Sequence, residues 1–306
     1  MTASGRLERF APAKINLALH VTGQRDDGYH EIDTLVGFAE TGDQLTFELA
    51  AAGQFPLTLR GSFADDLARQ GGDNIVIKAA EALAQAAAQA GLPVTGAAIV
   101  LEKHLPVASG LGGGSADAAA TLLGLRELWG LPEDFVLDEI AMRLGADVAM
   151  CLVSTPLRAA GIGENLQLLA DASSLNAVLV NPGVALSTVD VFAALKNKAS
   201  PPIGAWPASR GDDPFEPTQL ATLRNDLEVP ARTLQPVIGE VLDLIAAQRG
   251  CLLARMSGSG ATCFGIFSDP QVAQEAHRRI VDTKPHWWSV PTVIGGSQAE
   301  PIRQGK

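Results

Sequence analysis

A glycine-rich stretch between two regular segments constrains this chain more than any other feature. Within Pro106–Asp117, four of the five positions 110–114 are glycine, and the stretch lies between a strand-like run and an alanine- and leucine-rich helix predicted over 116–128. Glycine permits positive φ and close approach of the backbone to a ligand, and the free amides at a helix start attract anions. The stretch therefore predicts a phosphate-binding loop; the alternative is a flexible turn in which Ser115 only caps the helix.

The loop differs from the commoner nucleotide-binding motifs. No Gly-Lys-Ser/Thr sequence follows it, so it is not a P-loop, and its glycines lack the spacing of the dinucleotide fingerprint. Asp117, in the first helical turn, suits the helix dipole but would repel a bare phosphate. We therefore expect a bound cation between Asp117 and the phosphate.

Two charged residues far apart in the sequence are candidates for an ion pair. Asp147 is a lone carboxylate in an apolar run, where an ionised side chain is costly unless something pairs with it. Lys14 lies with Asn16 and His20 on the polar face of a half-buried strand, which strict alternation predicts over 11–21. Lys14 is thus the best partner for Asp147. The alternatives are that Asp147 caps a short helix and that Lys14 is an ordinary exposed lysine.

Periodicity and turn residues predict an α+β protein. Further strands are expected at 43–49, 55–59, 97–103 and 177–180 and around Leu253 and Cys263, and further helices at 74–90, 133–144, 236–248 and 270–281. A second glycine-rich turn, Arg255–Thr262, would alone be a hairpin connection. The length of 306 residues predicts about two domains, and the pattern changes near 155–170.

The charge balance argues against nucleic-acid and membrane partners. The 23 basic and 34 acidic residues give a net charge of −11, which repels phosphate backbones and anionic lipid. The three cysteines, Cys151, Cys251 and Cys263, have no metal-ligand spacing and are expected to be reduced, apolar core residues. Neither a secretion signal in residues 1–10 nor a transmembrane run is found, so a cytoplasmic protein is expected.

Taken together, these motifs resemble the GHMP kinase family. The resemblance is carried by Pro-Ala-Lys-Ile-Asn at 12–16, Gly-Tyr-His at 28–30, Leu-Gly-Gly-Gly-Ser at 111–115 and Leu-Gly-Ala-Asp-Val at 144–148. It implies a two-lobed fold, with a nucleotide-binding lobe related to ribosomal S5 domain 2 at 1–162 and a ferredoxin-like substrate lobe at 163–306. It also implies ATP and Mg²⁺, and a substrate in which methylerythritol is linked to cytidine diphosphate.

The same resemblance implies a role for each matching residue. Asp147 would accept the proton of the substrate hydroxyl, and Lys14 would pair with Asp147 and polarise that hydroxyl. The expected nucleotide-binding residues are Pro106, Val107, Ala108, Ser109, Gly110, Leu111, Gly112, Gly113, Gly114, Ser115 and Ala116, with Asn74 near the adenine. The expected substrate-binding residues are Asn16, Tyr29, His30, Phe192, Gly258 and Gly260, where Tyr29 and Phe192 would stack on cytosine and His30 would bond its edge. The metal ligands stay open.

Two departures and two alternatives accompany the resemblance. Ala108 and Ser109 replace glycines that some relatives have, and Asp117 replaces an asparagine. Another kinase of the family, of the homoserine or mevalonate type, is one alternative. A non-catalytic nucleotide- or RNA-binding module is the other, since S5-like lobes occur in ribosomal proteins, although the acidic charge disfavours it. The oligomeric state and the role of the proline-rich segment 201–217 stay open.

Overall fold

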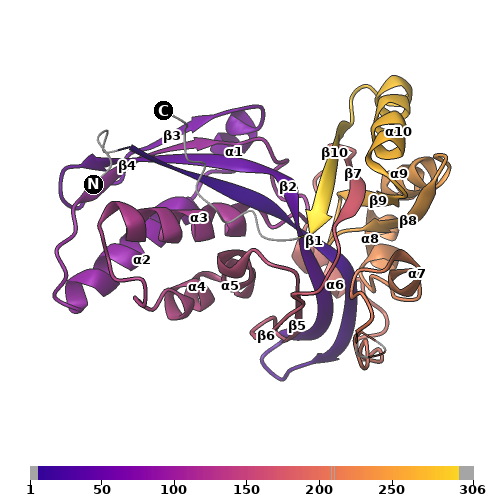
Figure 1. The fold of residues 1–306 in the computed structure, drawn as a ribbon, viewed down its shortest axis with the longest axis horizontal. Helices are drawn as coiled ribbons and strands as arrows, with labels where there is room; N and C mark the ends of the chain where they lie inside the picture. The colour runs from indigo at the N-terminus through magenta and orange to yellow at the C-terminus, as the bar shows by residue number, and fades with distance from the viewer. Residues whose placement is uncertain (1–5, 208, 210, 296–306) are drawn as a thin grey trace.

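The computed structural model, which describes residues 6–207, 209 and 211–295, has two parts joined by a pair of long strands (Figure 1). These strands, β1 (Arg6–Gln24) and β2 (His30–Ala50), pair in antiparallel fashion along almost their whole length, around a turn at residues 25–29. The remaining strands are β3 (Leu57–Arg60), β4 (Gly96–Glu102), β5 (Leu157–Gly161), β6 (Asn165–Leu168), β7 (Leu175–Asn181), β8 (Cys251–Met256), β9 (Cys263–Phe267) and β10 (Trp288–Gly295).

The N-terminal part consists of β1–β6 and five helices. These are α1 (Ala64–Gln70), α2 (Ile75–Gln89), α3 (Gly113–Leu128), α4 (Asp138–Leu144) and α5 (Ala146–Val153). The predicted helix at 74–90 is confirmed as α2, because its alanines and leucines favour a helix, Asn74 caps its start by accepting from the Val76 amide at 2.9 Å, and Gly91 ends it with φ 72°. Helices α2, α3, α4 and α5 bury their apolar faces against β2 and β4 in one hydrophobic core.

The C-terminal part has the ferredoxin-like arrangement that we expected. Its helices are α6 (Thr188–Ala193), α7 (Pro217–Leu220), α8 (Glu228–Leu234), α9 (Val237–Ala246) and α10 (Pro270–Thr283). The strand order β10-β7-β9-β8, with α9 and α10 as the crossover helices, is that of a split β-α-β unit. Through β10, which pairs with both β7 and β2, this unit joins the N-terminal strands in one ten-stranded sheet.

The prediction of a half-buried first strand is wrong. All residues from Ala11 to Val21 are buried, because helices and the C-terminal part cover both faces of β1. Register shifts after Pro12 and Asn16 also interrupt the alternation. The Nδ1 atom of His20 contacts the carbonyl oxygen of Pro201 at 3.1 Å.

Several other expectations differ in extent rather than in type. The run predicted at 43–49 is only the end of the much longer β2, and the helix predicted at 133–144 begins at Asp138. Cys151 and Cys263 are buried core residues, but Cys251 is only partly buried. The division at 162/163 stays a prediction. Residues 1–5, which belong to the stretch that lacks a secretion signal, lie outside the described residues. Among the described residues, no helix has the length and apolar character of a membrane span.

Candidate functional site

A cleft of about 730 Å³ lies at the junction of the two parts and contains most of the expected site residues. Apolar side chains of β3 and α1 form one section of its wall, and residues of α6 and the β8–β9 turn form another. The expected site residues that line the cleft are Lys14, Asn16, Asn74, Asp147, Phe192, Gly258 and every position of 106–115 except Leu111. Segments that are distant in the sequence therefore meet at this cavity.

The glycine-rich loop turns directly into α3 at the wall of the cleft. Gly112, with φ 61°, is the N-cap residue, so Ser115 lies inside the first turn and the alternative of a Ser115 cap is wrong. Ala116 is the first residue whose amide closes a helical bond, to the Gly112 carbonyl at 2.9 Å. The amides of Gly113, Gly114 and Ser115 have no acceptor within the helix, as is usual in the first turn of a helix. They are therefore available to an anion.

The two substitutions in the loop have different consequences. Ala108 has φ 51°, so this alanine adopts the left-handed conformation that glycine adopts without strain. Ser109 is buried, and its carbonyl accepts from the Thr262 amide at 3.0 Å. Leu111 and Ala116 are buried in hydrophobic cores and do not line the cleft. Their expected contact with nucleotide stays a prediction.

Lys14 and Asp147 contact each other, with 3.2 Å between Nζ and Oδ2. The ammonium of Lys14 also donates to Oδ1 of Asn16 at 3.0 Å, and a Cβ on Gly112 would come within 2.9 Å of the Lys14 stem. The ion pair thus lies directly against the glycine-rich loop. Lys14 is buried, but Asp147 is 46% exposed, so the sequence-based view of a carboxylate enclosed by apolar residues is wrong: Asp147 lies in the first turn of α5 and opens into the cleft.

The second glycine-rich turn, between β8 and β9, packs against the first loop. Ser257 Oγ accepts from the backbone amide of Asn16 at 3.1 Å and donates to the backbone carbonyl of Gly110 at 2.9 Å. Gly258 lines the cleft, and a Cβ there would come within 3.2 Å of Asn16 Oδ1. Gly260 packs on Met256 instead and is not on the cleft wall. The two loops and β1 therefore form one hydrogen-bonded unit.

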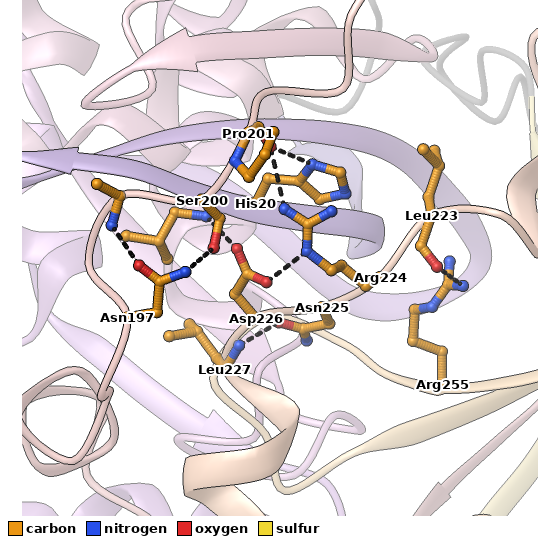
Figure 2. Close-up of polar contacts among 12 residues, drawn as sticks. His20, Asn197, Ser200, Pro201, Leu223, Arg224, Asn225, Asp226, Leu227 and Arg255 are labelled. Carbon is orange, nitrogen blue, oxygen red and sulfur yellow. Dashed lines mark hydrogen bonds and ion pairs between the residues drawn. The ribbon is translucent and has the colours of Figure 1, made fainter.

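A segment that the sequence analysis missed, residues 224–227, is hydrogen-bonded to the second glycine-rich turn and to β1. Figure 2 shows the contacts of Arg224 with Asp226 and Pro201. Asn225 is buried, and its side-chain amide donates to the backbone carbonyls of Met256 and Gly258, each at 2.8 Å. Asp226 accepts from the Val21 amide of β1 at 2.8 Å and from Arg224 at 2.7 Å. The only available signal was the polar Asn-Asp pair, a pattern typical of many turns.

We expect Asn225→Ala to destabilise the protein by about 1–3 kcal/mol, because two buried carbonyls would lose their donor. Chemical denaturation followed by circular dichroism measures this free energy of unfolding. Asn197→Ala is the matched control, since Asn197 is exposed and its side chain donates to Ser200 Oγ and accepts from the Ala199 backbone amide, each at 3.2 Å. Equal destabilisation by the two substitutions would contradict the role given to Asn225.

A second group that the sequence analysis missed lies beneath the glycine-rich loop. The ammonium of Lys103 contacts Asp43 Oδ2 at 2.6 Å and Asp117 Oδ2 at 2.7 Å. Burial acts to lower the pKa of Lys103, but the carboxylates of Asp117 and Asp43 together raise it. Lys103 thus supplies a positive charge beside Asp117, and the bound cation expected between Asp117 and the phosphate stays a prediction. No spacing in the sequence indicates this contact, because Asp43 belongs to β2, Asp117 belongs to α3 and Lys103 follows β4.

The three aromatic residues expected to bind a base are arranged differently from the expectation. The rings of His30 and Phe192 stack on each other, with centroids 4.6 Å apart and an interplanar angle of 25°. Tyr29 is 64% exposed and does not line the cleft. Burial, with a smaller contribution from Lys198, lowers the pKa of His30, and its Nε2 atom is buried without a partner in the described part of the chain. His30, like Tyr29, is not on the cleft wall, so the expected bond from His30 to the base stays a prediction.

Comparison with known proteins identifies relatives over almost the whole chain. Residues 74–155 match the family model for the GHMP kinases N terminal domain, and residues 216–285 match that for the GHMP kinases C terminal. A 4-diphosphocytidyl-2-C-methyl-D-erythritol kinase from Rhizobium etli is 49% identical, covering 94% of this chain and 95% of its own. The corresponding protein of Brucella melitensis biotype 1 is 48% identical, with coverage of 95% and 96%.

Solved structures show the same fold. A crystal structure of 4-(cytidine 5'-diphospho)-2C-methyl-D-erythritol kinase superposes with a TM-score of 0.76 at 34% identity, covering 95% of this chain and 100% of that one. A homoserine kinase from Cytophaga hutchinsonii superposes with a TM-score of 0.72 at 18% identity, covering 98% of each chain, which shows the fold alone.

Proposed function

The chain belongs to the GHMP kinase family, and from this membership we propose that it transfers the γ-phosphate of ATP to the 2-hydroxyl of 4-diphosphocytidyl-2-C-methyl-D-erythritol. The products are ADP, the 2-phosphate and the proton released from the hydroxyl. The reaction belongs to the non-mevalonate synthesis of isoprenoid precursors. The observation that carries the proposal is the Lys14–Asp147 ion pair, which lies against the glycine-rich loop in one cleft.

Phosphoryl transfer requires alignment of the attacking and leaving oxygens and neutralisation of charge more than covalent chemistry by the protein. Asp147 is half exposed to the cleft, so a substrate hydroxyl can reach its carboxylate and pass it the proton. Lys14 fixes the orientation of Asp147 and brings a positive charge next to the attacking oxygen. Asn16 in turn holds the Lys14 ammonium through its Oδ1 and is itself fixed by donating to Thr34 Oγ1 at 2.8 Å.

The start of α3 is suited to hold the nucleotide phosphates. Its free amides and its dipole favour a negative charge, and no side chain at Gly113 or Gly114 restricts the approach of an anion. The described residues contain no group of three or more His, Cys, Asp or Glu side chains able to hold a metal. We propose that Mg²⁺ is bound chiefly through the phosphate oxygens, which is its usual mode with nucleotides, and that it neutralises their charge.

The stacked pair of His30 and Phe192 is proposed to receive the cytosine. Because the ring centroids are only 4.6 Å apart, a base would stack on an outer face of the pair and not between the two rings. Within the described residues the Nε2 of His30 has no partner, but it is buried, so the ring must shift before this atom can meet the polar edge of the base. Tyr29, on the exposed turn beside His30, stays a predicted cover for the base.

Phe192→Ala is expected to raise KM for the cytidine substrate by about tenfold or more and to leave kcat nearly unchanged. Stacking of a base on an aromatic ring contributes about 1–3 kcal/mol, and the reacting groups would be untouched. Steady-state kinetics at saturating ATP measures both constants. Val189→Ala is the control, because Val189 lies on the same helix and is 76% exposed. A KM that is the same in the two variants would exclude Phe192 from the base-binding site.

Incubation with ATP, Mg²⁺ and the cytidine substrate tests the proposed function directly. We expect one ADP and one monophosphorylated product per turnover, and far slower turnover of homoserine and mevalonate. Equal or faster turnover of either of those alcohols would favour the first alternative. Binding to ribosomal RNA without ATP turnover would favour the second alternative.

A cytoplasmic location is also proposed, since ATP is the phosphate donor. The free cysteines are consistent with a reducing compartment. We propose no nucleic-acid partner, because the net charge of −11 opposes one.

A further inference from the structure

The cluster beneath the glycine-rich loop contains one more negative group than positive. Lys103, Asp43 and Asp117 are all nearly inaccessible to solvent, and a single ammonium serves both carboxylates. Asp43 is well satisfied, because its Oδ1 accepts from the amides of His104 at 2.6 Å and Leu105 at 2.9 Å. The excess charge therefore falls on Asp117.

Asp117 has one oxygen without a hydrogen-bond partner. Its Oδ2 contacts Lys103, but its Oδ1 is buried and has no partner within the described residues. The residue lines the same cleft as Gly113, Gly114 and Ser115. A Cβ on Gly113 would come within 3.0 Å of the Lys103 ammonium, so the loop backbone rests on this cluster. An anion bound at the loop would thus lie close to an unsatisfied carboxylate oxygen.

Among the described residues, the other elements packed on α3 offer Asp117 no further positive charge. Helix α5 contributes Cys151, and burial raises the pKa of its thiol. The charge of Lys14 is balanced by its own partner, Asp147. Helix α2 packs through apolar residues, and its half-exposed Lys78 pairs with Asp73. The ring of His104 is 48% exposed and faces Glu102. Burial, with a further contribution from Asp43, accordingly raises the pKa of Asp117 to about 7 in spite of Lys103.

We propose that Asp117 takes up a proton from solvent when nucleotide phosphates bind at the start of α3, and that in this neutral form it positions the glycine-rich loop for ATP. The inference rests on the proposed function, because it requires ATP at this loop. The physical reason is repulsion: a phosphate near an ionised buried carboxylate is unfavourable, and a like charge shifts the carboxyl toward its protonated form. A proton on Oδ1 removes this repulsion and converts the unsatisfied acceptor into a donor.

Calorimetric titration with a non-hydrolysable ATP analogue and Mg²⁺, in buffers of different ionisation enthalpy, measures the proton change. Near pH 7 we expect the wild type to take up about half a proton more per bound nucleotide than Asp117→Asn. Asparagine keeps the shape of the aspartate side chain and cannot ionise. Subtracting the proton uptake of Asp117→Asn from that of the wild type removes the contribution of the nucleotide itself. Above about pH 7 the Kd of the wild type should rise by up to about tenfold per pH unit. The Kd of Asp117→Asn should not show this rise.

Asp73→Asn is the matched control. It removes the same formal charge from the cleft wall, but Asp73 is 86% exposed and lies outside the buried cluster, so proton uptake should persist. Tight binding with equal proton uptake in wild type and Asp117→Asn would overturn the inference and leave the kinase proposal intact. Proton release on binding would also overturn it. Failure of the wild type to bind the analogue would instead refute the proposed function.

The wild type alone provides a second test if Asp117→Asn does not fold. A Kd for the analogue that stays constant from about pH 6 to about pH 9 would overturn the inference, because uptake of a proton by a group with a pKa near 7 requires a pH dependence in that range.

Discussion

Replacing Asp147 by asparagine is expected to lower kcat by about 10²- to 10⁴-fold, the usual contribution of a general base. Asparagine has the same shape but cannot accept the proton of the substrate hydroxyl. Because Asp147 is 46% exposed at the cleft wall, we expect both substrates still to bind. Steady-state kinetics at saturating substrates measures kcat, and calorimetry measures the two dissociation constants.

Asp190→Asn is the control for loss of a carboxylate in this region, because Asp190 is exposed on α6 and does not line the cleft. It should turn over at the wild-type rate. A kcat of Asp147→Asn close to that of Asp190→Asn would remove Asp147 from the role of base, while the assignment to the family would stand.

Lys14→Met is expected to cause a loss of kcat that is at least as large, about 10²-fold or more, since a charged group acting on a transition state contributes this much. Methionine retains most of the stem that packs beside Gly112 but removes the ammonium that contacts both Asp147 and Asn16. The affinity for the cytidine substrate should change much less than kcat. Lys78→Met makes the same substitution at a half-exposed lysine and should be close to wild type. Near-normal turnover by Lys14→Met would contradict its role.

The two variants are expected to differ in stability. The apolar run around Asp147 in the sequence suggests that Asp147 is the enclosed charge of the pair. In the structure Lys14 is the buried member and Asp147 is half exposed. Asp147→Asn should therefore destabilise the fold more than Lys14→Met does, because it leaves a buried ammonium with Asn16 as its remaining polar contact. Thermal unfolding of both variants checks this order.

Local patterns predicted the elements whose stability is mostly local. Helix α2 follows from its composition and its Asn74 cap, and the ferredoxin-like order follows from the family resemblance. The full burial of β1 could not be predicted in this way. Its alternation resembles that of a surface strand, whereas Ala11, Ile15 and Leu19 each enter a different hydrophobic core. Which element covers a strand depends on tertiary packing, and a period-2 pattern contains no information about it.

The candidate site was predictable where its residues are contiguous. The loop 106–115 is a single stretch whose glycines require one backbone shape, and the structure places it at the cleft. The approach of Lys14 to Asp147 followed from the need of a lone charge for a partner. Asn225 and the Lys103 cluster were missed, because their partners are main-chain carbonyls or residues of other helices and strands, and no spacing in the sequence indicates such contacts.

The pairing of β10 with β2 limits how this molecule can move. A strand from near the end of the described chain is hydrogen-bonded to Phe38 and Ala39, close to the residues that hold Lys14. The two parts are consequently connected through β1, β2 and β10, and not by a single linker. The strand that carries Lys14 is therefore held in place from both parts of the molecule.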